Sequence, residues 1–139
     1  MNRKILVILA ILTVGLAAVS VVSADTVVIN DVDLNLPEGY ALVYEDSASA
    51  YNQTGAANVF QNEKNTTVTI GVLDNALNLT LPDIAGLSDY HAVNKTIAGK
   101  EGILTNDDTN TTFTFVYLKD SKIIMIVADN ESTIEEFVK

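Results

Sequence analysis

Apolar and polar residues alternate through most of the chain after residue 31, which is the pattern of half-buried β-strands. In one such stretch, Val68, Ile70 and Val72 are expected to face a core, while Thr67 and Thr69 face solvent. The predicted strands cover residues 32–36, 40–44, 57–62, 66–73, 91–98, 102–106, 111–118 and 123–127.

Turn residues separate these strands. The expected turns are Pro37-Glu38-Gly39, Glu63-Lys64-Asn65 and Lys119-Asp120-Ser121-Lys122, the last of them a hairpin turn. The small and polar stretch Ser47–Thr54 predicts a loop, and the strands at 91–98 and 102–106 could also be continuous. Thr80 ahead of Pro82 favours a short helix or turn over Pro82–Ser88.

A central strand and a C-terminal helix complete the pattern. Ile123–Val127 is apolar at every position, which predicts a strand in the middle of a sheet with both faces covered. Ser132 and Glu135 have the spacing of a capping box, and Asn130 or Ser132 can begin a helix there. The apolar stripe of this helix consists of Ile134, Phe137 and Val138. The predicted fold class is therefore α+β, an antiparallel sheet of about six to seven strands with a C-terminal helix packed on it.

The first 24 residues have the order of a secretory signal peptide. A basic start, Asn2-Arg3-Lys4, precedes the uncharged run Ile5–Val22, and Val22-Ser23-Ala24 offers small residues for cleavage after Ala24. This predicts a single extracytoplasmic domain over residues 25–139. An uncleaved N-terminal membrane anchor stays open, because the run of 18 residues is nearly long enough to span a bilayer. Either alternative places the domain outside the cell or on its surface.

The charge and the cysteine content exclude several kinds of partner and several kinds of site chemistry. After residue 24 the chain has 18 acidic residues, six lysines and no arginine, a net charge of −12. A surface this acidic repels phosphate backbones and anionic lipid heads, so no nucleic acid is expected, and a membrane only through the N-terminal segment. The chain has no cysteine, which excludes disulfides, thiolate nucleophiles and cysteine-ligated zinc.

The catalytic inventory is small. His91 is the single histidine, and although Ser88 and Asp89 are near it in sequence, neighbouring residues on a strand point to opposite faces. Gly99-Lys100-Glu101-Gly102 lacks the ending of a phosphate-binding loop and is expected to be a tight turn or bulge. We therefore predict no catalytic residues and no cofactor, while a hydrolase using a carboxylate pair stays open.

Oxygen ligands for Ca²⁺ are the one metal chemistry that the composition favours. Asp31-Val32-Asp33-Leu34-Asn35 resembles the start of a calcium loop, but Leu36 and Leu42 occupy the positions that need glycine and glutamate. Two acidic turns are weak candidates if they meet in space, and their residues are Asp107, Asp108, Asp129 and Glu131.

Glycosylation sequons are the densest motif. Six Asn-x-Ser/Thr triplets lie after residue 24, where the frequencies of asparagine and hydroxyl residues predict roughly two by chance. The candidate asparagines are Asn52, Asn65, Asn78, Asn94, Asn110 and Asn130. If modified, they mark a cell-surface glycoprotein whose sheet edges are shielded by sugar.

Several short motifs carry a family resemblance. They are Leu36-Pro37-Glu38-Gly39-Tyr40, Ile97–Gly102, Phe113–Tyr117, Lys122–Ile126 and Ile134–Val138. Together with the signal peptide, this frame resembles small secreted proteins of uncharacterised function from methanogenic archaea. The order of elements also resembles the Mog1/PsbP-like fold, although Tyr40 stands where that family commonly has tryptophan. The resemblance implies a fold and transfers no functional residue.

These observations favour an exported, acidic, non-catalytic domain associated with the cell envelope or acting as an interaction module, its partner an unidentified protein or envelope component. The alternative is an extracellular module that binds a small ligand or Ca²⁺. A hydrolase with an acidic pair is the third and weakest hypothesis.

Overall fold

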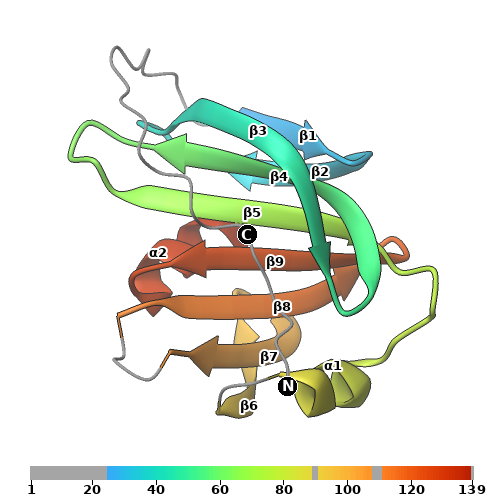
Figure 1. The fold of residues 1–139 in the computed structure, drawn as a ribbon. Helices are drawn as coiled ribbons and strands as arrows, with labels where there is room; N and C mark the ends of the chain where they lie inside the picture. Colours follow the sequence, from blue (N-terminus) through green and yellow to red (C-terminus); the bar gives the residue numbers. More distant parts are fainter. Residues whose placement is uncertain (1–24, 89–90, 108–110, 139) are drawn as a thin grey trace.

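The computed structural model describes residues 25–88, 91–107 and 111–138, which form nine strands and two helices (Figure 1). The elements are β1 (Asp25–Ile29), β2 (Val32–Leu36), β3 (Ala41–Ala50), β4 (Gln53–Gln61), β5 (Thr67–Asp74), α1 (Leu81–Leu87), β6 (Ala92–Ile97), β7 (Lys100–Asn106), β8 (Phe113–Lys119), β9 (Lys122–Ala128) and α2 (Glu131–Val138). The predicted signal peptide and anchor, with Asp89, Asp108 and Asn110, lie outside the described residues.

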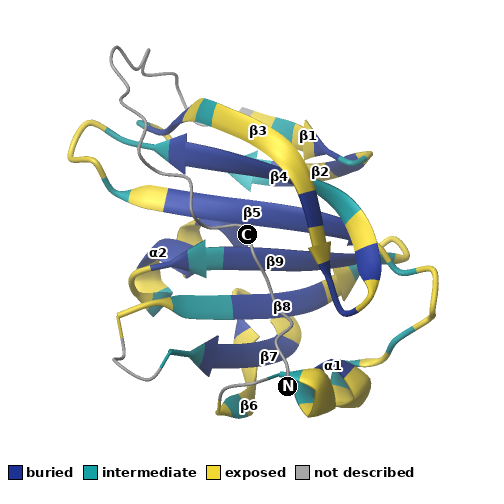
Figure 2. Cartoon of the chain, viewed as in Figure 1, coloured by how far each residue is buried: buried dark blue, intermediate teal, exposed yellow. Residues whose placement is uncertain are grey.

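Seven strands form one antiparallel sheet in the order β3-β4-β5-β9-β8-β7-β6. β9 is the middle strand, and Figure 2 shows β5 and β9 buried along most of their length. Since β9 contains the continuous apolar run, its predicted central position is confirmed. The predicted α+β class, with a C-terminal helix packed on the sheet, is confirmed as well.

One face of the sheet is covered by α2 and by the separate β1–β2 hairpin, both behind the sheet in Figure 1. The Phe137 ring of α2 is fully buried and meets the Tyr40 ring edge-on, with 4.9 Å between centroids. The Nδ2 atom of Asn35 in β2 donates to the Glu136 carbonyl oxygen at 3.2 Å, joining the hairpin to the helix. The predicted apolar stripe of α2 is therefore confirmed as the contact with the sheet.

The opposite face is covered by α1 and by the curled end of the β3–β4 hairpin. Ile84 of α1 is fully buried, and Ala48 of β3 packs in the same apolar cluster as Met125 of β9. The prediction that Thr69 faces solvent is wrong, because its side chain lies on this face between the cross-strand neighbours Val59 and Val127.

The prediction of a loop over Ser47–Thr54 is wrong. The stretch forms the end of β3, a two-residue turn and the start of β4, with Ala50 paired to Gln53. Tyr51 and Asn52 make the turn with φ values of 53° and 64°. Two positive φ values are what the type I′ hairpin turn requires, because its twist matches that of the strands.

Other hairpin turns also have two consecutive residues with positive φ. Ala98 and Gly99 have φ values of 50° and 84°, so they separate β6 from β7. The alternative of one continuous strand through residues 91–106 is therefore wrong. Asp120 and Ser121, with φ values of 53° and 64°, confirm the hairpin turn predicted between the last two strands.

The helix starts were predicted with mixed success. The short helix is confirmed one residue earlier than expected, and Thr80 and Asp83 form a full capping box. For α2 the capping box of Ser132 and Glu135 is wrong. The Oδ1 atom of Asn130 accepts from Thr133 N at 2.8 Å, so Asn130, the other predicted start, caps the helix.

Candidate functional site

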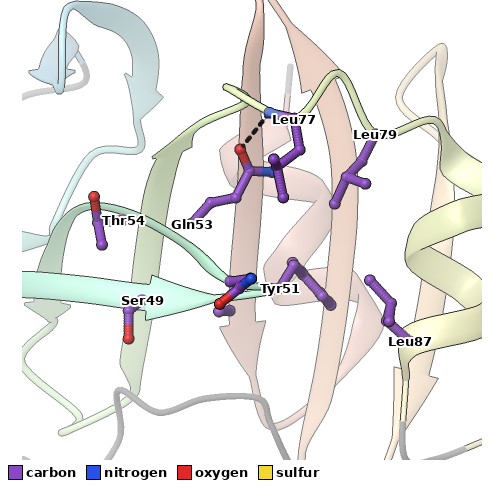
Figure 3. A pocket seen from close by; sticks show the side chains of 9 residues that line it. Ser49, Tyr51, Gln53, Thr54, Leu77, Leu79 and Leu87 are labelled. Carbon is purple, nitrogen blue, oxygen red and sulfur yellow. Dashed lines mark hydrogen bonds between the residues drawn. The ribbon is translucent and has the colours of Figure 1, made fainter.

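A hollow of about 740 Å³ lies at the tip of the β3–β4 hairpin, and we call it the hairpin-tip hollow (Figure 3). It is lined by Ser49, Ala50, Tyr51, Asn52, Gln53 and Thr54 of the hairpin and by Leu77, Leu79 and Leu87 from the segment around α1. Figure 3 shows Leu79 and Leu87 on the side away from Ser49 and Thr54. The hollow therefore has one apolar side and one polar side.

A network of side-chain amides holds this hollow in shape. Gln53 is buried, and its Oε1 atom accepts from Leu77 N at 2.9 Å while Nε2 donates to Asn75 Oδ1 at 3.1 Å. The Asn75 amide in turn exchanges two hydrogen bonds with the Leu79 backbone, at 2.8 and 3.0 Å. Because the amides satisfy backbone groups that no strand pairs, the loop before α1 is fixed against the hairpin.

Tyr51 is the buried titratable group of the hollow. Burial raises its pKa to about 12, and a hydrogen bond with Ser88 opposes this effect in part. The phenol is consequently neutral at physiological pH, so it can donate or accept a hydrogen bond but does not act as a base.

A second depression, of about 410 Å³, lies between the β1–β2 hairpin and the β3–β4 edge, and we call it the acceptor groove. It is lined by Val28, Ile29, Asn30, Glu45, Asp46, Ala56 and Asn58. Asn58 is 7% exposed, and among the described residues its side chain has no hydrogen-bond partner. Glu45 is its cross-strand neighbour, so the two side chains leave the same face of the sheet about 5 Å apart at Cβ.

Asn30 adds another acceptor to this groove. Its Nδ2 atom donates to the Val72 carbonyl at 3.0 Å and to Asp74 Oδ1 at 3.1 Å, which uses both amide hydrogens. Its Oδ1 atom accepts nothing from the residues that the structure describes. The groove thus combines a carboxylate and two amide oxygens with the 59% exposed side chain of Val28.

The two acidic turns predicted to hold Ca²⁺ lie at the same end of the sheet. Asn106 pairs with Phe113 and Phe113 with Ala128, so Asp107 and Asp129 follow strands that flank the start of β8. Two strand spacings separate them, about 10 Å along the sheet.

The described carboxylates of these turns have other partners. Asp107 Oδ1 accepts from Thr111 N at 2.8 Å, and Glu131 forms an ion pair with Lys95 at 3.0 Å. Among residues 25–88, 91–107 and 111–138, no three histidine or carboxylate side chains are grouped for a metal. Asp108 lies outside these ranges, so the calcium site stays a prediction.

Five of the six sequons lie within the described residues. In each of them both the asparagine and the hydroxyl residue are exposed. These asparagines are Asn52, Asn65, Asn78, Asn94 and Asn130. The Thr80 hydroxyl, in the sequon of Asn78, also donates to Asp83 Oδ2 at 2.9 Å as part of the α1 cap.

The remaining residues considered from the sequence are dispersed. His91 is exposed directly before β6, and the Ser88 hydroxyl donates to the Ile84 carbonyl at 3.3 Å. Asp31 and Asp33 are exposed in the β1–β2 hairpin. The tight turn expected in Gly99-Lys100-Glu101-Gly102 is confirmed at Gly99, which with Ala98 connects β6 to β7, while the other three residues lie inside β7.

Both depressions were missed from the sequence. The hairpin-tip hollow joins Gln53 to Leu77 and Leu87, which are far apart in the chain, and its hairpin side was expected to be a loop. Asn58 gave a usable signal, because it is a polar residue between Ala57 and Val59 in an apolar strand.

The fold and these sites define a small α+β domain built on a seven-stranded antiparallel sheet. No family model, curated protein or solved structure matches the chain. The resemblance to Mog1/PsbP-like domains and to methanogen proteins therefore stays a prediction. Neither helix in the described part of the chain has the length and apolar composition to cross a membrane.

Proposed function

We propose that this protein is an exported, N-glycosylated domain of the cell surface that binds another protein and does not act as a catalyst. The observation that carries the proposal is the exposure of both sequon residues at all five described sites. A transferase needs access to the asparagine amide and its neighbouring hydroxyl residue, and buried triplets would offer neither. The apolar N-terminal run and the charge of −12 support export and a solvated surface.

Intact mass of the protein purified from its own host tests export and glycosylation together. We expect a chain that begins at Asp25 and carries additional sugar mass, because cleavage after Ala24 and modification occur during export. The control is the same chain made in a host without N-glycosylation. An unmodified chain that retains Met1 and is recovered inside the cell, unattached to membrane, contradicts the proposal. A sugar-bearing chain that retains residues 1–24 in the membrane fraction favours the anchor.

The partner is proposed to present lysine or arginine side chains to the acceptor groove. Asn58, Asn30 and Glu45 supply acceptor oxygens, and Val28 offers an apolar surface for the methylene stem of a basic side chain. A buried amide without a partner costs free energy, which a bound donor would recover. The net charge of −12 after residue 24 attracts basic partners from a distance.

Titration with the peptide acetyl-Gly-Lys-Gly-amide, followed by NMR of the Asn58 and Asn30 side-chain amides, tests this groove. We expect millimolar binding that Glu45→Gln weakens about 1.5- to fivefold, since an exposed ion pair contributes about 0.2–1 kcal/mol. The matched control, Glu63→Gln, removes the same charge in the β4–β5 turn and should leave binding unchanged. Equal weakening by both variants, or a response to Ca²⁺ and not to the peptide, contradicts the assignment.

A module for a small ligand is the second candidate, because the hairpin-tip hollow has the volume of small-molecule sites, about 300–1,000 Å³. A native mass spectrum of the same preparation would then show a non-covalently bound compound.

A further inference from the structure

The side chains that line the hairpin-tip hollow are of the kinds found in sugar-binding sites. A pyranose ring has apolar C–H faces and an edge of hydroxyl groups, and it needs both kinds of neighbour. Leu77 and Leu87, 56% and 46% exposed, supply an apolar surface. Ser49 and Thr54 supply hydroxyl groups on the other side (Figure 3), while the Gln53 amide is bonded to Leu77 N and Asn75 and holds the leucine side in place.

One of the sequon asparagines, Asn52, lines this hollow. Asn52 is the second residue of the β3–β4 turn, it is exposed, and its own side chain is part of the lining. A sugar joined to its Nδ2 atom would therefore start inside the hollow. Asn65, another exposed turn asparagine with positive φ, lies in the β4–β5 turn and is not part of that lining.

We propose that the hairpin-tip hollow holds the first sugar residues of a glycan attached to Asn52, which cover Leu77 and Leu87. This inference rests on the proposed glycosylation and assigns a structural role to one of its sites. Tethering makes the contact effective, because a sugar covalently attached at the rim has a high local concentration in the hollow. The glycan then stabilises the fold by removing exposed leucine surface from water.

The test compares glycosylated protein from its own host with unglycosylated protein, in three sequences. The native sequence keeps all sequons, Thr54→Ala removes the one at Asn52, and Thr67→Ala removes the one at Asn65. For each sequence the glycan effect is the melting temperature of the glycosylated form minus that of the unglycosylated form. The effect of the substitution itself cancels in this difference.

We expect glycosylation to raise the melting temperature of the native sequence and of Thr67→Ala by about 3–5 °C, the shift that about 1 kcal/mol produces in a domain of this size. This increment should be lost in Thr54→Ala. The methyl resonances of Leu77 and Leu87 should also shift on glycosylation of the native sequence and stay unshifted in Thr54→Ala. These methyl shifts separate contact from a general effect of surface sugar.

Site-resolved mass distinguishes the possible failures. A chain without sugar at any sequon overturns both the proposed glycosylation and the proposal that the hollow holds a glycan. Sugar at other sequons but not at Asn52 overturns only the proposal that the hollow holds a glycan. Sugar at Asn52 with unshifted leucine methyls, or with an equal loss of the increment in Thr54→Ala and Thr67→Ala, also overturns that proposal and leaves glycosylation standing.

Discussion

Replacing Phe137 with alanine is expected to lower the free energy of unfolding by about 3–5 kcal/mol, the usual cost of removing a buried aromatic ring. Phe137 is fully buried, with its ring centroid 4.9 Å from that of Tyr40 and 6.1 Å from that of Phe60. It joins α2 to the segment before β3 and to the C-terminal end of β4. Its removal would therefore leave a cavity among three parts of the chain.

Urea unfolding followed by circular dichroism measures this effect. Glu136→Ala is the matched control, because it changes the preceding residue of the same helix at an exposed position and leaves the backbone carbonyl that Asn35 contacts. Its effect should stay within about 0.5 kcal/mol. A loss below about 1 kcal/mol in Phe137→Ala would mean that α2 does not form part of the core.

The central strands were predictable because local hydrophobic patterns indicate their burial. Ile123–Val127 is apolar on both faces, and Val68, Ile70 and Val72 repeat every second residue, so strand type and position follow from the sequence alone. Strand β1 was missed, since Thr26–Ile29 is short and only Ser23, Ala24 and Asp25 separate it from the apolar N-terminal run. Its partner β2 was predicted correctly but belongs to a separate two-stranded sheet, and no local pattern encodes which sheet a strand joins.

The same difference between local patterns and long-range contacts applies to the candidate sites. Sequons are local triplets, and the sequence located all six. The hairpin-tip hollow depends on contacts over more than 20 residues, such as Gln53 with Leu77, and on a hairpin whose small residues resemble a loop. The N-cap of α2 shows a smaller version of this difficulty. Asn130 and Ser132 both have capping side chains, and the fold decides between them through the hydrogen bond to Thr133 N.

Gly55→Ala is expected to destabilise the domain by about 3 kcal/mol, because Gly55, directly after the stretch that resembled a loop, allows a close approach of β4 to β5. A Cβ atom at residue 55 would overlap the Val72 carbonyl oxygen and lie 2.7 Å from the Leu73 Cα atom. Both obstacles belong to the backbone of β5, so relief requires the paired strands to separate. Urea unfolding measures the loss, and the NMR signal of the Gln53 side-chain amide reports the accompanying change in the hairpin tip.

Gly71→Ala is the matched control on the adjacent strand. A Cβ atom there would meet only the Ala48 Cβ atom within 4 Å, at 4.0 Å, an ordinary contact. The substitution should be neutral or stabilising by up to about 1 kcal/mol, since alanine restricts the unfolded chain more than glycine does. Equal losses in the two variants would show that strand glycines act through chain entropy and side-chain size in general. A loss confined to Gly55→Ala would instead mean that the curl of the β3–β4 hairpin depends on one backbone contact, and with it the position of Asn52 over the hollow.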